Sequence, residues 1–246
     1  MGTNTISDAS LWEIFVGHHD ALLGLFYSDV MISSNSLSAQ SNVENDKSWE
    51  YLGSISPLQD VFSQNQNLYT NQDIDAKNYN LVYTDAWLVN ELSSVSSKIN
   101  STVMEVIEVK DIKDIQLFAD LFLEAYSLET DPYGKLKPTY KSCIINSFRS
   151  KATKVKFYYI LHQGMPCATF ALSFSSNFCY SYCIGVIPKY RGLGISHYIY
   201  SYLNNEAAKK KCKFNILQTI SSSYVEKLAM SNGFVPIGKF SLYESI

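Results

Sequence analysis

The pattern of apolar and polar positions is most regular after residue 102. Residues 112–126 and 192–211 repeat apolar side chains every three or four positions, which predicts two amphipathic helices. Residues 103–109 alternate apolar and polar side chains, as a half-buried strand does. Four further runs are rich in aromatic and β-branched residues and predict strands at 155–162, 166–174, 178–187 and 214–220. The remaining expected elements are a helix over 139–149, a helix from Ser223 to Asn232-Gly233 and two short final strands.

The first hundred residues carry weaker signals between stretches rich in Ser, Asn and Gln. A capping box at Ser10-Leu11-Trp12-Glu13 predicts a helix over about 11–26. Asn80–Val89 is rich in aromatic and β-branched residues and predicts a strand. We expect a long polar loop over 33–50 and a short helix opened by Ser56-Pro57.

Residues 91–102 are polar and have the composition of a linker. We therefore expect an N-terminal region over 1–102 and a separate domain over 103–246. In the second part the elements follow the order β-α-α-β-β-β-α-β-α-β-β, which predicts an α/β fold with helices on the faces of a mixed sheet.

Charge divides the chain at the same place. Residues 1–102 hold three Lys and twelve Asp or Glu, a net charge of −9, whereas residues 103–246 carry a net charge of +6. Such a difference favours different partners for the two parts. Attraction between the two parts explains the same numbers equally well.

Several classes of protein do not fit this composition. No apolar run approaches the roughly 18 residues that span a bilayer, and a signal peptide is not expected at the N-terminus. The five cysteines lack zinc-ligand spacing, so we expect no metal and free thiols in a reducing cytoplasm. The basic charge is too modest for a nucleic-acid partner.

The segment Ile184–Ile195 carries the clearest chemistry. A strand ends at Pro188, a short basic turn follows, and Gly192 and Gly194 open a helix. The first amides of a helix lack intrahelical partners and favour an anion, and glycine lets a diphosphate approach the backbone. The segment lacks the other signals of a P-loop or a dinucleotide fingerprint. It therefore predicts a cradle for a phosphate-bearing ligand, to which Arg191 adds a permanent charge.

This segment resembles a known family. Val186 to Ile195 matches the strand-to-helix signature of the GNAT superfamily of acyl-CoA-dependent N-acyltransferases, and Gly233-Phe234 matches the family's later Gly-Phe pair. The resemblance covers about residues 103–246, in element order as well as in motif. It implies a GNAT-like fold, acetyl-CoA as co-substrate and an amine acceptor that attacks the thioester directly.

The resemblance also implies which residues hold the co-substrate. Amides of the turn and the helix start would bind the CoA pyrophosphate, namely those of Arg191, Gly192, Leu193, Gly194, Ile195 and Ser196. Backbone groups of Ile184 and Val186 would pair with the acyl carbonyl and the pantetheine arm. Ser222 aligns with an Asn that many relatives place early in the next helix.

The chain departs from the family at the usual general acid. Many relatives carry a Tyr four residues before the Gly of Gly-Phe, and that position is Ala229 here. Tyr224 and Tyr243 are the candidate substitutes, with packing as the alternative role of each.

A general base is not evident either, because residues 155–187 contain no Asp or Glu. Glu129 and Asp131 either bind a cationic amine or form solvated surface. The expected role of His162, beside a hairpin turn, and of His197, on the predicted cofactor helix, is structural. His18 and His19 are adjacent on the first predicted helix and cannot share one face.

Three hypotheses follow. The first is an N-acetyltransferase that transfers an acetyl group from acetyl-CoA to a primary amine, with the acidic first part shaping the acceptor cleft. The second is a CoA-binding regulatory or interaction protein without turnover. The third is an adaptor whose glycine turn binds nothing. Residues 1–102 are either a degenerate GNAT-like copy or an unrelated cap.

Overall fold

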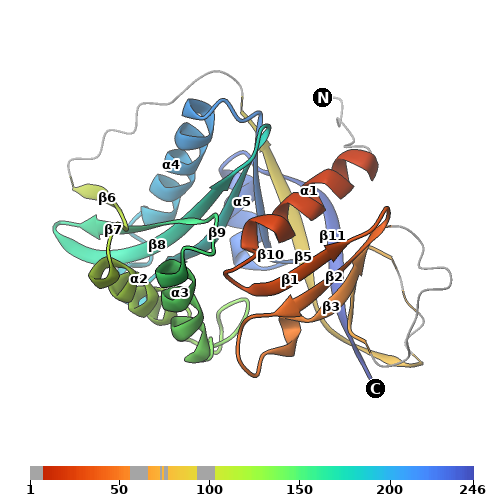
Figure 1. Cartoon of the computed structure of the whole chain (residues 1–246). Helices are drawn as coiled ribbons and strands as arrows, with labels where there is room; N and C mark the ends of the chain where they lie inside the picture. Colours follow the sequence, from red (N-terminus) through yellow and green to blue (C-terminus); the bar gives the residue numbers. More distant parts are fainter. Residues whose placement is uncertain (1–7, 56–65, 73, 75–76, 93–102) are drawn as a thin grey trace.

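The structure is a computed structural model that describes residues 8–55, 66–72, 74, 77–92 and 103–246. Its eleven described strands form one mixed sheet in the order β1-β2-β3-β4-β11-β5-β10-β9-β8-β7-β6 (Figure 1). The strands of the N-terminal region are β1 (Tyr27–Ile32), β2 (Ser36–Ser41), β3 (Tyr51–Ser54), β4 (Leu68–Thr70) and β5 (Tyr79–Glu91). Those that follow are β6 (Met104–Glu108), β7 (Lys156–His162), β8 (Met165–Phe174), β9 (Phe178–Val186), β10 (Phe214–Ile220) and β11 (Val235–Ser245).

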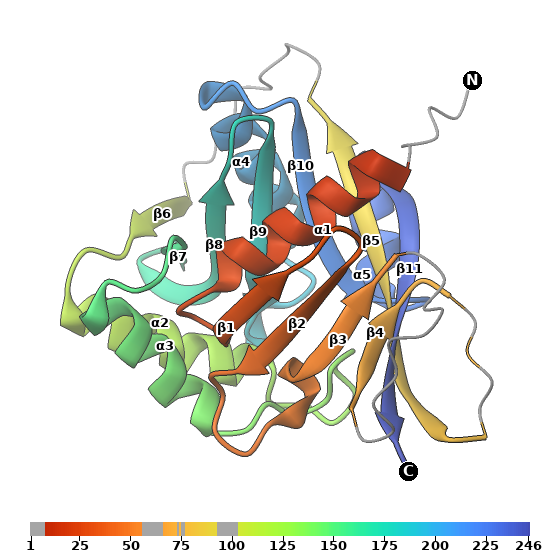
Figure 2. The same cartoon turned by 45° about the vertical axis from the view of Figure 1, so that its right-hand side comes forward.

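Helices cover both faces of this sheet (Figures 1 and 2). The helical elements are α1 (Asp8–Leu22), η1 (Lys47–Trp49), α2 (Ile112–Ala125), α3 (Thr139–Ser150), η2 (Pro188–Tyr190), α4 (Ile195–Lys209) and α5 (Tyr224–Ser231). On one face α1 packs against β9 and Trp87, and α2 packs against β7 to β9. On the other face α4 lies against β8 to β10, and α5 lies against β10. None of the helices in the described ranges is long and apolar enough to cross a membrane.

The last strand of each part of the chain lies against the other part. β5 precedes residue 102, yet it pairs antiparallel with β10 and β11, which both follow it. β11 in turn pairs with β4 of the N-terminal region. Both parts also contain a run of three antiparallel strands, β1 to β3 and β7 to β9, whose third strand pairs in parallel with a fourth, β4 or β10. In the second part β6 adds one more antiparallel strand beside β7. The sheet is therefore continuous across the boundary expected at residue 102.

Most predicted elements of the second part are confirmed to within a few residues. The cap of α5 is also as expected, because the Ser223 hydroxyl accepts a hydrogen bond from the Glu226 amide at 3.2 Å. The α4 helix starts later than predicted, since residues 191–194 form a turn in which both glycines have positive φ. The short helix predicted at Ser56-Pro57 and most of the predicted linker lie outside the described residues.

Three expectations from the sequence are wrong. The helix predicted over 11–26 ends at Leu22, because Gly24 takes a left-handed conformation (φ +77°). The stretch 33–50 is not a long loop: it contains β2 and η1, and small polar side chains of β2 alternate with the buried Leu37 and Ala39. The chain ends in one long strand, not two short ones, because β11 absorbs two register shifts and stays paired with β5.

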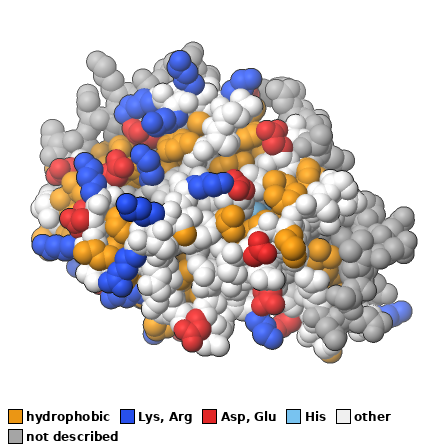
Figure 3. Space-filling model, viewed as in Figure 1, with side chains coloured by type: hydrophobic (Ala, Val, Ile, Leu, Met, Phe, Trp, Pro, Cys, Tyr) orange, Lys and Arg blue, Asp and Glu red, His pale blue; other side chains and the backbone are white. Residues whose placement is uncertain are grey.

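Charge also links the two parts. Lys154 and Asp20 approach to 2.7 Å, and Lys137 and Asp46 to 3.7 Å. Figure 3 shows Lys and Arg side chains gathered over the side formed by β6, β7, α2 and α3, whereas few lie over the N-terminal strands. The Lys154–Asp20 pair is exposed, and pairs of this kind contribute about 0–1 kcal/mol. The shared sheet and core therefore join the two parts more strongly than their opposite charges do.

Candidate active site

The site lies where two parallel strands separate. β9 and β10 pair only from Phe178 to Ser181 and from Phe214 to Leu217. β9 nevertheless continues to Val186 and β10 to Ile220. A register shift between β8 and β9 and the positive φ of Cys183 (52°) turn this part of β9 away from its neighbour. The gap between the strands opens into two adjoining cavities.

The smaller cavity, of about 350 Å³, lies against the glycine turn. Seven of the nine predicted co-substrate residues line it, namely Ile184, Val186, Arg191, Gly192, Gly194, Ile195 and Ser196. Gly192 (φ +84°) and Gly194 (φ +76°) would each place a Cβ atom in open space. Within the described part of the chain the amides from Gly192 to Ser196 donate to no acceptor, so the turn fits a phosphate-bearing group.

Arg191 does not present a free charge to this cavity. Its guanidinium donates to the carbonyl oxygens of Val186 (3.1 Å) and Ala125 (2.7 Å) and lies 2.8 Å from the Asp131 carboxylate. The backbone amide of Arg191 donates to the Pro188 carbonyl oxygen. The side chain thus ties the glycine turn to the end of α2 and to the loop after it, a role that differs from the predicted contact with phosphate.

Tyr126 closes one wall between the cavities. Its hydroxyl donates to the Ile184 carbonyl at 2.7 Å. The Val186 carbonyl likewise accepts a hydrogen bond from Arg191. Since both carbonyls are engaged, Ile184 and Val186 would bind a ligand through their N–H groups. Tyr126 reaches this place because Gly185 has no side chain: a Cβ there would lie 2.7 Å from the Ala125 Cβ and 3.0 Å from the Tyr126 ring.

We expect Gly185→Ala to destabilise the protein by about 1–3 kcal/mol, since the added methyl group overpacks this contact. Urea unfolding measures the loss. The matched test is the double variant Gly185→Ala/Ala125→Gly, which removes the methyl that is in the way. If the double variant is less stable than Gly185→Ala, the steric explanation is wrong.

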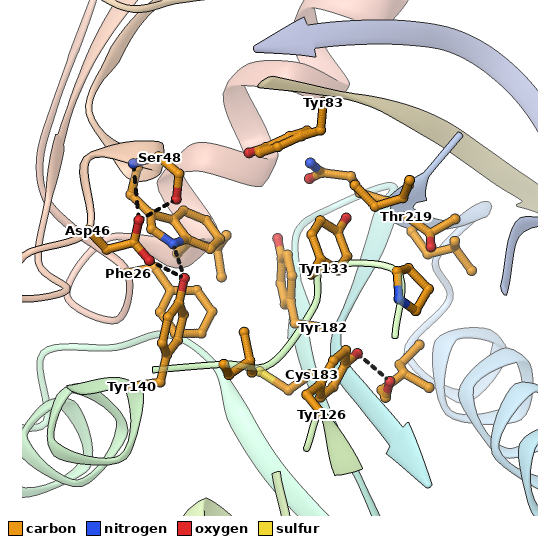
Figure 4. A pocket seen from close by; sticks show the side chains of 18 of the residues that line it. Phe26, Asp46, Ser48, Tyr83, Tyr126, Tyr133, Tyr140, Tyr182, Cys183 and Thr219 are labelled. Carbon is orange, nitrogen blue, oxygen red and sulfur yellow. Dashed lines mark hydrogen bonds between the residues drawn. The ribbon is translucent and has the colours of Figure 1, made fainter. Parts of the chain in front are cut away.

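The larger cavity, of about 480 Å³, takes its walls from both parts of the chain. Twelve of its 29 lining residues are aromatic: Phe26, Tyr27, Trp49, Tyr51, Tyr69, Tyr83, Phe122, Tyr126, Tyr133, Tyr140, Tyr182 and Tyr200. Figure 4 shows Tyr83, Tyr133 and Tyr182 converging from β5, the loop after α2 and β9. The two cavities share Tyr126, Pro132, Ile184, Tyr200 and Val225, so they meet at the opening between the strands.

A buried carboxylate lies beneath the larger cavity. Asp85, on β5, is fully buried and accepts hydrogen bonds from Tyr69 (2.8 Å), Tyr133 (2.9 Å) and Gln218. All three donors line the cavity. Burial raises the pKa of Asp85 to about 7, although the three hydrogen bonds act in the opposite direction. Sequence reasoning missed this group, yet an Asp inside an otherwise aromatic and β-branched strand is a signal of function.

The tyrosines considered as general acids differ in whether they line a cavity. Tyr224, at the start of α5, lines the smaller cavity, and burial raises its pKa. Tyr243 lies on β11 beside β4 and lines neither cavity. Ala229 is fully buried. Tyr200 of α4, not considered from the sequence, lines both cavities, and burial raises its pKa as well.

The remaining predicted residues have varied positions. Leu193 is exposed and lines neither cavity, and Ser222 is exposed with its amide bonded to Glu226. Glu129 is exposed, whereas Asp131 is buried against Arg191 and is not solvated surface.

The four histidines are also divided between cavities and packing. His18 lines the larger cavity, and His197 lines the smaller one with its Nδ1 2.8 Å from Asn232. His19 contacts Tyr51 through its Nε2, and the His162 ring lies near Tyr190. No cluster of metal-ligating side chains occurs among the residues that the structure describes.

Comparison with solved structures identifies the fold. A functionally unknown conserved protein from Staphylococcus epidermidis is 12% identical and has a TM-score of 0.64, with 90% of this chain and 95% of that chain covered. A GCN5-related N-acetyltransferase from Kribbella flavida is 12% identical with a TM-score of 0.60 over 93% and 94% of the two chains. Another from Sphaerobacter thermophilus is 11% identical with a TM-score of 0.59 over 96% and 85%.

The chain therefore has the fold of the GCN5-related N-acetyltransferases, and the predicted fold class is confirmed. Neither the family models nor the curated proteins contain a match to its sequence. At this level of identity the likeness extends to the fold alone.

Proposed function

We propose that the protein is an acyl-CoA-dependent N-acyltransferase that transfers an acetyl group from acetyl-CoA to a primary amine. The observation that carries the proposal is the pair of adjoining cavities at the separated ends of β9 and β10. One cavity begins at unpaired helix-terminal amides, which suit a diphosphate. The other is an aromatic cavity that suits an acceptor.

The residues present support direct attack by the amine. Bound acetyl-CoA would supply the thioester, with its pyrophosphate on the amides from Gly192 to Ser196. Backbone N–H groups at Ile184 and Val186 would orient the acyl carbonyl and stabilise its developing negative charge. Holding both reactants at the meeting point of the cavities supplies the proximity that the reaction needs.

Tyr200 is the proposed donor of a proton to the leaving thiolate, because it lines both cavities and its phenol stays protonated at neutral pH. We expect Tyr200→Phe to lower kcat about 100-fold while acetyl-CoA binding changes little. Tyr224→Phe is the matched comparison, since Tyr224 lines only the smaller cavity. A larger loss of kcat in Tyr224→Phe would assign the proton to Tyr224 instead.

Release of free thiol from acetyl-CoA in the presence of a panel of amines tests the proposal. Thiol release that depends on both the amine and the protein supports the transferase. Binding of acetyl-CoA without thiol release would favour the second hypothesis, a CoA-binding regulatory protein, and Ala229 at the usual acid position is the observation behind it.

We also propose that residues 1–102 are a degenerate copy of the GNAT-like half. The support is the repeated arrangement of three antiparallel strands followed by a parallel pair, with the last strand of each half exchanged. The N-terminal half would then shape the acceptor cavity, since its residues line the larger cavity and none of them lines the smaller one.

A further inference from the structure

The N-terminal half supplies the acceptor cavity with a carboxylate of unusual position. Asp85 is one of few buried acidic side chains in the described residues, and no Lys or Arg there forms an ion pair with it. Its Oδ2 accepts from Tyr69 and Gln218, and its Oδ1 accepts from Tyr133. A carboxylate so buried is costly without a counterion, and such perturbed groups beside a cavity are concentrated at functional sites.

Tyr133 connects this carboxylate with the cavity. It lies in the loop between α2 and α3, its hydroxyl is 2.9 Å from Asp85, and its side chain lines the cavity (Figure 4). Its ring also meets Tyr83 edge to face, with centroids 6.2 Å apart. The Tyr133 oxygen therefore connects a group bound in the cavity with Asp85, whereas the other phenol on Asp85, Tyr69, is buried and also accepts from Trp87 and Gln218.

We propose that Asp85 and Tyr133 together take the proton from the ammonium group of the acceptor, and that this acceptor is a primary amine on an apolar or aromatic body. The inference rests on the proposed function and names the base and the substrate class of that site. As the ammonium passes a proton to the Tyr133 oxygen, the phenol proton moves to Asp85 Oδ1, and the neutral amine remains.

The balance of the reaction is complete. The neutral amine attacks the thioester carbonyl, so that the C–N bond forms and the C–S bond breaks. Conversion of an ammonium into an amide releases two protons in all. One passes through Tyr133 to Asp85 and returns to water through Tyr133, which is partly exposed, after the product leaves. The other replaces the proton that Tyr200 gives to the thiolate, which becomes the free thiol of CoA.

The walls of the cavity indicate the body of the acceptor. Aromatic faces attract a cation and also shelter an apolar group. The acidic side chain that lines the cavity itself, Asp46, is already engaged by Ser48, Tyr140 and Lys137. One carboxylate is thus left for one ammonium, which suits a monoamine with an apolar body better than a polyamine or an aminosugar.

The titratable groups around Asp85 set the direction of the pH dependence. They are Tyr69 on β4, Tyr133 in the loop, Tyr83 on β5 and, further around the cavity, His18, Tyr27, Asp46, Tyr51, Tyr126, Lys135, Lys137, Tyr140, Tyr182, Cys183 and Tyr200. Burial lowers the pKa of His18 well below its usual value, and burial raises the pKa of the tyrosines. Asp85, with its pKa of about 7, is therefore the group that loses its proton near neutral pH.

The test measures thiol release with acetyl-CoA and each of 2-phenylethylamine, spermidine and glucosamine, as a function of pH. For the wild type we expect kcat/KM for 2-phenylethylamine to exceed that for the other two amines. It should rise as Asp85 loses its proton near pH 7 and fall again as the free ammonium loses its own. Faster turnover of spermidine or glucosamine would overturn the assigned acceptor class.

Variants identify the base. Asp85→Asn and Tyr133→Phe should each lower kcat/KM about 100-fold near neutral pH. In Asp85→Asn the pH profile of kcat/KM should no longer be bell-shaped and should instead rise steadily toward the pKa of the amine. Asp46→Asn and Tyr83→Phe, matched changes in the same cavity, should keep the rise near pH 7. Thermal unfolding and acetyl-CoA binding, measured on all four, separate loss of fold from loss of the base.

Besides a different acceptor preference, three outcomes would overturn the inference. Asp85→Asn could keep the wild-type profile, or His18→Asn could remove the rise near pH 7 in place of Asp85→Asn. In either case the proposed transferase function would stand. Absence of thiol release by the folded wild type with all three amines would overturn the proposed function itself, and this inference with it.

Discussion

Gly192→Val should abolish binding of acetyl-CoA while leaving the fold intact. Gly192 has φ +84°, and a Cβ built on it meets no atom within 4 Å, so the valine side chain would occupy open space at the mouth of the smaller cavity. That is where a diphosphate would approach the amides of the turn. We expect the affinity to fall more than about 100-fold, or about 2.7 kcal/mol of binding free energy.

A matched glycine separates this effect from backbone strain. Gly164, in the turn between β7 and β8, has φ +78°, also has open space around a built Cβ, and lines neither cavity. A non-glycine residue at such a φ costs roughly 1–2 kcal/mol of folding stability in either place. Calorimetric titration should therefore show wild-type affinity for Gly164→Val only. If Gly192→Val binds acetyl-CoA as tightly as the wild type, the turn is not the phosphate site.

The contrast between these glycines also shows what the sequence can and cannot predict. The Val186–Ile195 motif is local, because a strand end, a turn and a helix start are specified by neighbouring residues. The turn and its cavity were therefore predictable, down to residues such as Gly192 and Gly194. The periodic helices and aromatic strands of the second half were predictable for the same reason.

The acceptor side depends instead on contacts between distant segments. Asp85, Tyr133 and Gln218 come from three elements, and the pairing of β5 with β10 of the other half brings them together. No spacing along the chain encodes that pairing. Small polar strands such as β2 were missed because their alternation is carried by Ser and Ala, with Leu37 as the one large apolar residue.

The motif placed Arg191 beside the predicted phosphate site but did not predict that its side chain binds Asp131 and two backbone carbonyls. Its side chain is 32% exposed, whereas the carboxylate of its partner Asp131 is only 2% exposed. Removing the guanidinium leaves a buried charge without its counterion and also frees the carbonyls of Ala125 and Val186. We expect Arg191→Ala to lower the free energy of unfolding by about 3 kcal/mol, measured by urea denaturation.

Two comparisons test this explanation. Lys154→Ala breaks the exposed pair with Asp20, whose side chains are 58% and 50% exposed, and should cost at most about 1 kcal/mol. Adding Asp131→Asn to Arg191→Ala removes the unpaired buried charge, so the double variant should be more stable than Arg191→Ala. If it is less stable, Arg191 does not act by neutralising Asp131. A different result would assign Arg191 to the phosphate site: a stable Arg191→Ala whose loss of acetyl-CoA affinity becomes smaller as the salt concentration rises. Salt screens exposed charges more than buried ones.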